Sequence, residues 1–197
     1  MIIIYNVDDK DEVVQFNPFP PSVGAPIPTA NVYLISGPLG VGKSTVSKSL
    51  ANAMKQCALI EGDLLLHVYR GETEPPWEDR LRLAWLNIVA VTRNLLRHGI
   101  DVVIDFVVEE ELEWFRDQLS DFNVTLHYAV LHAAPDTLMV RLRQRGDEQY
   151  ISRSLFLRNK LMSSAGNEAF LLDTDRKQPS ELAEEIVKDQ RFRLKSV

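Results

Sequence analysis

The stretch Gly37-Pro38-Leu39-Gly40-Val41-Gly42-Lys43-Ser44 is the most informative part of this sequence of 197 residues. It matches the pattern G-x-x-x-x-G-K-[ST] at every fixed position, and it lies between an apolar run, 32–36, and a predicted helix. Glycines let the backbone curl so that successive N–H groups point at phosphate oxygens, and a helix N-terminus adds its positive dipole end. The motif therefore predicts a loop that binds the phosphates of a nucleoside triphosphate.

Two residues of this loop have separate predicted roles. Lys43 is expected to reach the β- and γ-phosphates as a point charge, and the Ser44 hydroxyl is expected to ligate Mg²⁺. ATP and Mg²⁺ are thus the expected cofactors. The residues expected to bind the nucleotide are Gly37, Pro38, Leu39, Gly40, Val41, Gly42, Lys43, Ser44 and Thr45.

Apolar runs and helical patterns alternate along the rest of the chain. Expected strands occupy 32–36, 58–61, 101–108, 124–131 and 170–172, and expected helices occupy 43–56, 77–98, 109–119, 135–145, 151–164 and 179–190. Strands separated by helices pair in parallel through right-handed crossovers. The pattern predicts an α/β fold, a three-layer P-loop NTPase sandwich with a mostly parallel five-stranded sheet. Ligands are expected at the carboxyl ends of its strands.

The N-terminal region differs from the rest of the chain. Five of the ten prolines fall within 18–28, and because proline lacks a backbone donor this stretch is expected to be an extended linker. Before it, two β-prone runs flank a polar turn, which predicts a β-hairpin arm. We expect two parts, the arm and linker at 1–30 and a P-loop kinase domain at 31–197. The arm is compatible with a homodimer formed through it.

Composition bears on the partners that the chain can have. The 22 basic and 28 acidic residues give a net charge of −6, which argues against a non-specific nucleic-acid binder. No apolar run approaches the roughly 18 residues of a membrane span, and no basic segment typical of a secretory signal begins the chain. We expect a soluble cytoplasmic protein that binds a small-molecule acceptor and neither nucleic acid nor membrane.

Other motifs separate the classes of phosphate-binding-loop protein. A GTPase would carry D-x-x-G and N-K-x-D, and neither pattern occurs in this sequence. A motor ATPase would usually place a glutamate after the aspartate that ends its Walker-B strand, but Asp105 is followed by Phe106. Since no hydrolytic base is evident, transfer of the phosphoryl group to a bound acceptor is favoured.

Two carboxylates are expected at the ligand-binding edge of the sheet. Asp63 follows the second strand, where it can take the proton of an acceptor hydroxyl or hold Mg²⁺ through water, or else cap a helix that begins at Leu64. Asp105 ends the third strand, where it either supports the metal or acceptor or is a solvated strand-end carboxylate. Ser44, Asp63 and Asp105 are therefore the candidate metal ligands.

Arginines follow the fourth strand. Arg141 and Arg145 are four residues apart, so they share one face of the predicted helix 135–145. Small kinases close a lid over the transferring phosphoryl group, and guanidinium groups of arginines on that lid stabilise its negative charge. The alternative interpretation of these arginines is a solvated basic helix end, which the helix dipole favours. The catalytic candidates are Asp63, Lys43, Arg141 and Arg145.

Several other residues bear on the acceptor. Trp77 is a candidate for the acceptor pocket, whereas Trp85 lies on an apolar stripe and is expected in the core. His67 is the one histidine near Asp63. The acidic residues that follow the third strand are interpreted as a solvated helix start, and they are Glu109, Glu110, Glu111 and Glu113.

The order of these motifs resembles that of the small P-loop kinases of metabolites and antibiotics, which include gluconate kinase, shikimate kinase and chloramphenicol phosphotransferase. The resemblance covers 31–190 and depends on Gly62-Asp63-Leu64, on a helix with Ala84-Trp85 that leads into the strand ending at Asp105, and on 143–147. It implies ATP- and Mg²⁺-dependent phosphorylation of a hydroxyl of a sugar acid, antibiotic or similar metabolite, with Asp63 as the base. It also implies that Asp173-Thr174 belongs to the adenine-side loop.

Two other functions stay open. A nucleoside or nucleotide kinase would need further arginines near the acceptor, for which Arg70, Arg80 and Arg82 are candidates. A non-catalytic nucleotide-dependent switch would use nucleotide binding to drive association through the N-terminal arm. The acceptor-region segment 71–77 has no match in the antibiotic kinase, so the resemblance does not identify the acceptor.

Overall fold

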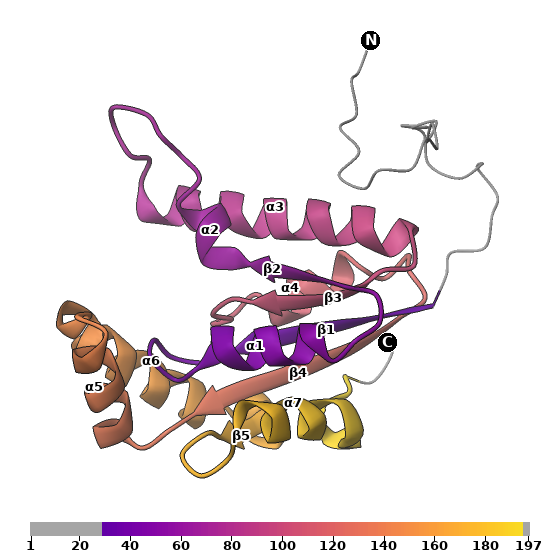
Figure 1. The fold of residues 1–197 in the computed structure, drawn as a ribbon. Helices are drawn as coiled ribbons and strands as arrows, with labels where there is room; N and C mark the ends of the chain where they lie inside the picture. Colours follow the sequence, from indigo (N-terminus) through magenta and orange to yellow (C-terminus); the bar gives the residue numbers. More distant parts are fainter. Residues whose placement is uncertain (1–28, 195–197) are drawn as a thin grey trace, which may run out of the picture.

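The chain folds as strands that alternate with helices (Figure 1). The computed structural model describes residues 29–194, so the predicted hairpin arm and nearly all of the linker lie outside the described residues. The strands are β1 (Ala30–Ser36), β2 (Cys57–Glu61), β3 (Asp101–Asp105), β4 (Val124–His132) and β5 (Leu171–Asp173). The helices are α1 (Lys43–Asn52), α2 (Gly62–Leu66), α3 (Trp77–Arg97), α4 (Leu112–Asp117), α5 (Pro135–Gln144), α6 (Ile151–Ser163) and α7 (Pro179–Lys188). Short 3₁₀ helices span Glu148–Tyr150, Ala165–Phe170 and Gln190–Phe192.

The five strands form one sheet in the order β2-β3-β1-β4-β5. Every pair of neighbouring strands is parallel, so the predicted fold class is confirmed for the sheet. Parallel strands covered on both sides must be apolar on both sides, which explains their nearly continuous apolar runs. Along β1, for example, Val32 and Leu34 face one layer of helices, while Tyr33 and Ile35 face the other.

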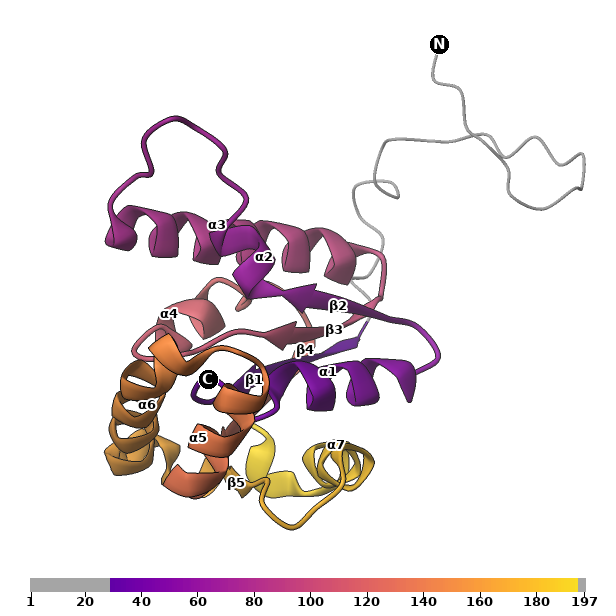
Figure 2. The same ribbon diagram turned by 60° about the vertical axis from the view of Figure 1, so that its left-hand side comes forward.

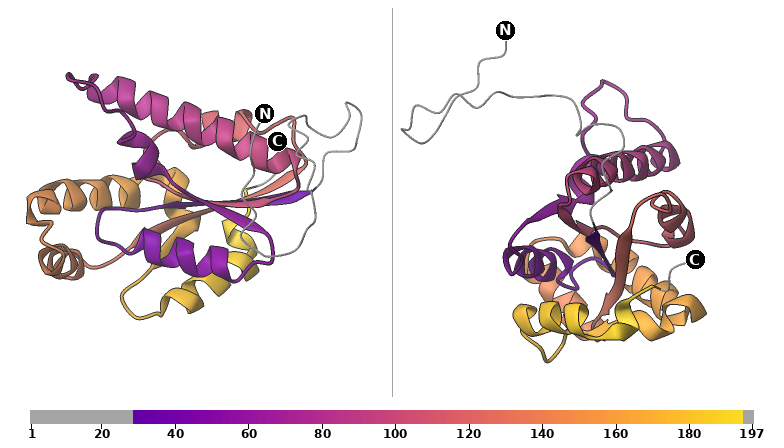
Figure 3. Two further views of the ribbon diagram at one scale, coloured as in Figure 1. Left: turned by 45° about the horizontal axis from the view of Figure 1, so that its top comes forward. Right: turned by 90° about the vertical axis from the view of Figure 1, so that its right-hand side faces the viewer.

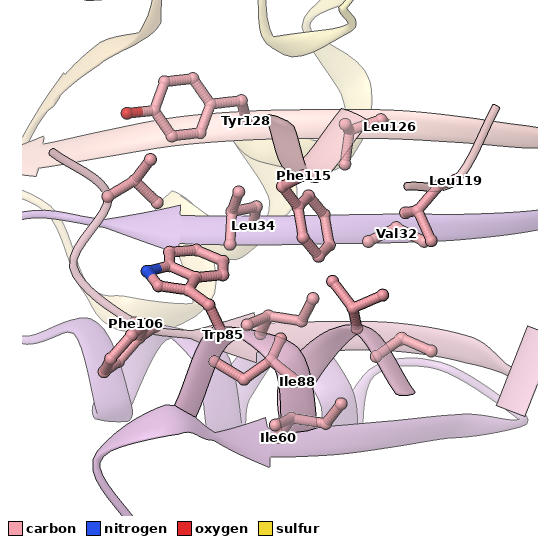
Figure 4. Packing of buried hydrophobic residues seen from close by; sticks show 14 of the residues in the cluster. Val32, Leu34, Ile60, Trp85, Ile88, Phe106, Phe115, Leu119, Leu126 and Tyr128 are labelled. Atoms are coloured by element: carbon pink, nitrogen blue, oxygen red, sulfur yellow. The ribbon is translucent and has the colours of Figure 1, made fainter. Parts of the chain in front are cut away.

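Helices cover both faces of the sheet, as the left view in Figure 3 shows. On one face, α3 and α4 pack through an apolar stripe that includes Trp85 and Ile88. Trp85 is buried against Phe106 and Phe115, with ring centroids 5.2 and 5.8 Å away, which confirms it as a core residue (Figure 4). The other face is covered by α1 and α7. Among residues 29–194, no helix combines the length and the apolar character needed to cross a bilayer.

The region after β3 differs from the prediction. The strand ends at Asp105 and not at Val108, because the N–H of Val108 donates to the buried Ser36 hydroxyl at 2.9 Å and not to a neighbouring strand. The helix starts at Leu112, because the Glu111 carboxylate accepts the N–H of Glu109 at 2.8 Å and holds that residue in a turn. A helix after β2 was considered only as an alternative that begins at Leu64, whereas α2 begins at Gly62, and α1 ends at Asn52, four residues earlier than predicted.

The carboxyl ends of the strands meet at one edge of the sheet. Asp105 at the end of β3 is in register with Ile35 of β1 and with Glu61 of β2. In Figure 1, α5 and α6 lie beyond the arrowhead of β4, and Figure 2 brings this end of the molecule forward. The loop between β1 and α1 therefore lies at the centre of this edge, with α2 on one side and the α5–α6 pair on the other.

Candidate functional site

The loop between β1 and α1 has the backbone shape that binds phosphate. Gly37, Gly40 and Gly42 have φ angles of 142°, 76° and 106°, values that residues with side chains rarely adopt. A Cβ atom at Gly37 would also lie 2.5 Å from the carbonyl oxygen of Leu131, so both space and φ require glycine there. Because Gly42 is the N-cap of α1 and has no capping side chain, the first N–H groups of this helix are left for an anion.

Lys43 lies across this loop. Its Nζ donates to the carbonyl oxygens of Gly37 at 3.0 Å and of Pro38 at 3.1 Å. An ammonium group has three N–H donors, so one remains for a further acceptor such as a phosphate oxygen. Burial lowers the pKa of Lys43, while the negative charges of Asp105 and Asp63 act in the opposite direction. Both carboxylates predicted for the site are thus close enough to act on the lysine.

Asp105 is a buried carboxylate at the end of β3. It is 7% exposed, so the alternative of a solvated strand end is wrong. Burial raises its pKa, and the Lys43 ammonium and the Ser44 hydroxyl lower it. The structure therefore brings together Lys43, Ser44 and Asp105 at the mouth of the loop, as expected from their positions at the end of β3 and the start of α1.

Asp63 lies in the first turn of α2. Because this helix begins at Gly62 with Glu61 as its N-cap, Asp63 does not cap a helix starting at Leu64, and that alternative is wrong. Gly62 packs directly on the ring of Phe106, where a Cβ would approach to 2.5 Å. This close approach holds the start of α2 against the end of β3. The exposed Asp63 side chain consequently lines the same cavity as Lys43.

That cavity has a volume of about 840 Å³ and extends from the loop toward α2, α3 and α6. Its loop end includes Lys43, Ser44 and Arg145. Its far end is lined by Leu66, His67, Glu74, Trp77, Arg80, Leu81, Phe106, Glu109, Glu111 and Arg153. Cavities of this size hold small molecules, and this one adjoins the predicted phosphate site. The position expected for Trp77 beside an acceptor agrees with this lining.

The two candidate lid arginines lie in different places. Arg145 lines the 840 Å³ cavity, with its Nε 3.5 Å from the Asp147 carboxylate. Arg141 instead donates to the carbonyl oxygen of Val41 at 2.9 Å and to the Thr174 hydroxyl at 3.1 Å. It lines a second cavity of about 530 Å³, between the loop and the segment that joins β5 to α7. Arg145 and not Arg141 is therefore in the cavity that contains Asp63.

The interpretation of Glu109 as part of a solvated helix start is wrong. Its side chain is 21% exposed and forms ion pairs with Arg153 at 2.6 Å and with Lys160 at 3.0 Å. Both partners belong to α6, so these bonds tie the β3–α4 segment to α6 beside the cavity. The partners are 44 and 51 residues away in sequence, which is why no local pattern indicated them.

Comparison with known proteins agrees with this geometry. A family model described as an AAA domain matches residues 32–162, about two thirds of the chain. The chain belongs to this AAA domain family. The match begins in β1 and ends in α6, so the AAA domain includes the loop, both carboxylates and both lid arginines. None of the curated proteins that were searched is similar enough to match.

Solved structures share the P-loop kinase-like fold of this AAA domain. The tunicamycin resistance protein of Deinococcus radiodurans is 18% identical with a TM-score of 0.59, covering 80% of this chain and 94% of its own. A Sinorhizobium meliloti gluconokinase is 20% identical with a TM-score of 0.52, covering 82% and 91%. The Mycobacterium tuberculosis APS kinase, in complex with AMPPNP and APS, is 16% identical with a TM-score of 0.58, covering 81% and 96%. The predicted resemblance to small P-loop kinases is confirmed as a likeness of fold.

Proposed function

We propose that this protein is a kinase that transfers the γ-phosphoryl group of ATP to a hydroxyl of a small molecule, with Mg²⁺ as cofactor. The observation that carries the proposal is the shared cavity, in which a phosphate-binding loop adjoins a carboxylate, Asp63, and a pocket large enough for an acceptor. The kinases among the structures of this fold, one of them with AMPPNP bound, support it.

The nucleotide is expected to bind on both sides of the loop. Its β- and γ-phosphates take the loop N–H groups and the remaining N–H of Lys43. Its nucleoside part occupies the 530 Å³ cavity beside Arg141 and Thr174. Arg141 is already oriented by the Val41 carbonyl and by Thr174, so its guanidinium plane is held as one wall of that cavity.

The residues at the mouth of the loop fit Mg²⁺. This ion prefers oxygen ligands, and in nucleotide sites it takes one or two from the protein and the others from phosphates and water. The Ser44 hydroxyl and the Asp105 carboxylate would hold it, with Asp63 acting through water. Within residues 29–194 no group of three or more His, Cys, Asp or Glu side chains could hold a metal by itself. Bound with the nucleotide, Mg²⁺ supplies positive charge against the phosphate oxygens.

The remaining residues divide the transfer between them. Asp63 accepts the proton of the acceptor hydroxyl while that oxygen attacks the γ-phosphorus, and the bond from phosphorus to the β–γ bridging oxygen breaks. Lys43 and Arg145 hold the charge that develops on the transferred group. Arg145 follows the last turn of α5, so it would move together with the α5–α6 pair. Movement of this pair over the loop would also exclude water from the reaction.

Two substitutions test this division of roles. Lys43→Ala should lose nucleotide affinity, because the loop then lacks its only lysine. Asp63→Asn should keep ATP affinity but lose about 10²- to 10⁴-fold in turnover, the usual contribution of a general base. Binding of AMPPNP by calorimetry and ATP consumption with a panel of sugars, sugar acids, nucleosides and antibiotics measure the two effects.

Asp79→Asn is the matched control, since Asp79 is an exposed carboxylate on α3 that pairs with Arg82 outside the cavity. It should behave as the parent in both assays. A parental rate of acceptor phosphorylation by Asp63→Asn would show that Asp63 is not the base.

A further inference from the structure

Charges at the far end of the larger cavity select among acceptors. We infer from these charges that the acceptor is an alcohol without a negative charge, and that its apolar part lies against Trp77 and Leu81. This inference rests on the kinase function proposed above. This class excludes nucleotides, sugar acids and other anions as the preferred acceptors.

The first reason is an excess of carboxylates. Away from its loop end, the cavity is lined by Asp63 at the start of α2 and by the charged side chains of the far end, which are Glu74, Glu109, Glu111, Arg80 and Arg153. Four of these side chains are acidic and two are basic, and Lys160 pairs with Glu109 from α6, so this part of the site carries one more negative than positive charge. An anionic acceptor would enter this surplus and also approach the triphosphate on the loop, and both repel it.

The second reason is that both arginines are already paired. Arg80 Nη1 lies 2.7 Å from a carboxylate oxygen of Glu74, and Arg153 Nη2 lies 2.6 Å from one of Glu109. Each guanidinium uses one nitrogen for its glutamate, so a carboxylate or phosphate that bound the remaining N–H groups would lie beside that glutamate and be repelled by it. A neutral acceptor leaves both ion pairs intact.

Arg80 has a different role in this arrangement. Its guanidinium lies over the ring of Trp77, 5.5 Å from the centroid, and its side chain is only 17% exposed. Through Glu74 it also holds the segment 67–76, which projects beyond the start of α3 (Figure 1). Arg80 is therefore a positioning residue that joins this segment to the indole ring of Trp77.

The third reason is the apolar surface beside these charges. Leu66 and Phe106 are buried at the base of the cavity, Leu81 is partly buried, and Trp77 is 48% exposed. A half-exposed indole beside aliphatic side chains offers a flat surface on which a ring can stack. An alcohol with an apolar ring or arm gains contact here, whereas a short polyol would leave this surface in water.

Pairs of one neutral and one anionic acceptor test the inference. The probes are 4-(hydroxymethyl)benzamide and 4-(hydroxymethyl)benzoate, glucose and gluconate, and adenosine and AMP, each titrated into the full chain saturated with Mg²⁺ and AMPPNP. The neutral member of each pair should bind about tenfold more tightly or better, and ATP consumption should follow the same order. Tighter binding or faster turnover of the acids overturns the inference and leaves the kinase function standing. Nucleotide binding without consumption on any member contradicts the proposed kinase function itself.

A charge variant makes the test independent of the acceptor scaffold. Glu74→Gln removes the partner of Arg80, so the affinity ratio of acid to neutral compound should rise about tenfold. Glu72→Gln is the matched control, because Glu72 is exposed on the same segment and outside the cavity lining, and it should leave the ratio unchanged. An unchanged ratio in Glu74→Gln overturns the inference. Trp77→Ala should weaken the benzamide more than glucose, and equal losses contradict the stacking part of it.

Discussion

Lowering the pH should weaken the fold through one buried histidine. His127 on β4 is 1% exposed, and its ring stacks on Tyr33 with centroids 4.4 Å apart. Within residues 29–194, neither of its ring nitrogens has a hydrogen-bond partner. Burial lowers the pKa of His127 from 6.5 to about 4, and the positive charge of Arg193 acts in the same direction, whereas the backbone of Ile186 and the negative charge of Asp101 oppose both.

The sign and size of the effect follow from these two pKa values. In the unfolded chain His127 takes up a proton near pH 6.5, whereas in the folded chain it does so only near its lowered pKa. Between these two pH values, acid therefore favours the unfolded chain. The stabilisation is complete above pH 6.5 and is lost as the pH falls toward 4. Because one pKa unit corresponds to about 1.4 kcal/mol, the loss at pH 5 is about 2 kcal/mol. That is a large part of the roughly 5–15 kcal/mol that holds a typical domain together.

Urea unfolding at pH 7.5, 6 and 5, followed by far-UV circular dichroism, measures the loss. The comparison is with His127→Phe, which keeps an aromatic ring on Tyr33 and sacrifices no hydrogen bond. The parent should lose about 2 kcal/mol more than this variant between pH 7.5 and 5. His98→Phe, at an exposed position, should retain the parental pH dependence. Equal losses in the parent and His127→Phe would refute the reasoning, since other titrating groups are common to both.

Two further predictions concern the phosphate-binding loop. At Gly42 an added Cβ would meet open space, but the φ of 106° should cost Gly42→Ala about 1–3 kcal/mol of folding stability. At Gly37 the added Cβ would also lie 2.5 Å from the Leu131 carbonyl oxygen, so Gly37→Ala should cost more. The urea midpoint should fall further for Gly37→Ala, and equal midpoints would contradict the steric argument. The Ser154 hydroxyl on α6 donates to the Leu39 carbonyl at 2.7 Å and is buried. Ser154→Ala should cost about 1–3 kcal/mol and speed amide exchange along α6, and parental exchange rates would show that this bond does not hold the helix.

Most elements of the fold were predictable because they depend on local periodicity. The starts of α1, α3 and α5 agree with the prediction, since Lys43, Trp77 and Pro135 begin clear helical patterns. The end of β3 was not predictable, because the buried Ser36 hydroxyl accepts the N–H of Val108, which is 72 residues away in the sequence. A hydrogen bond between distant segments leaves no trace in the periodicity of either one.

The candidate site divides in the same way. The residues of the loop, Gly37 to Ser44, are contiguous in the sequence. The pattern of its glycines and lysine was therefore enough to predict a phosphate site without knowledge of the rest of the chain. Burial of Asp105 and the position of Asp63 in α2 needed the structure, because both depend on how β2 and β3 pack against the helices.

The sequence by itself determined the strand–loop–helix unit that is predicted to bind phosphate, since every group of the motif lies within a few residues of Lys43. Only the tertiary structure decided which charges neutralise one another around the larger cavity. Arg153 binds Glu109 from 44 residues away, and Lys160 binds it from 51 residues away. The crossovers of the sheet bring such residues together, and the Glu109 carboxylate, only 21% exposed, is then stabilised by both cations.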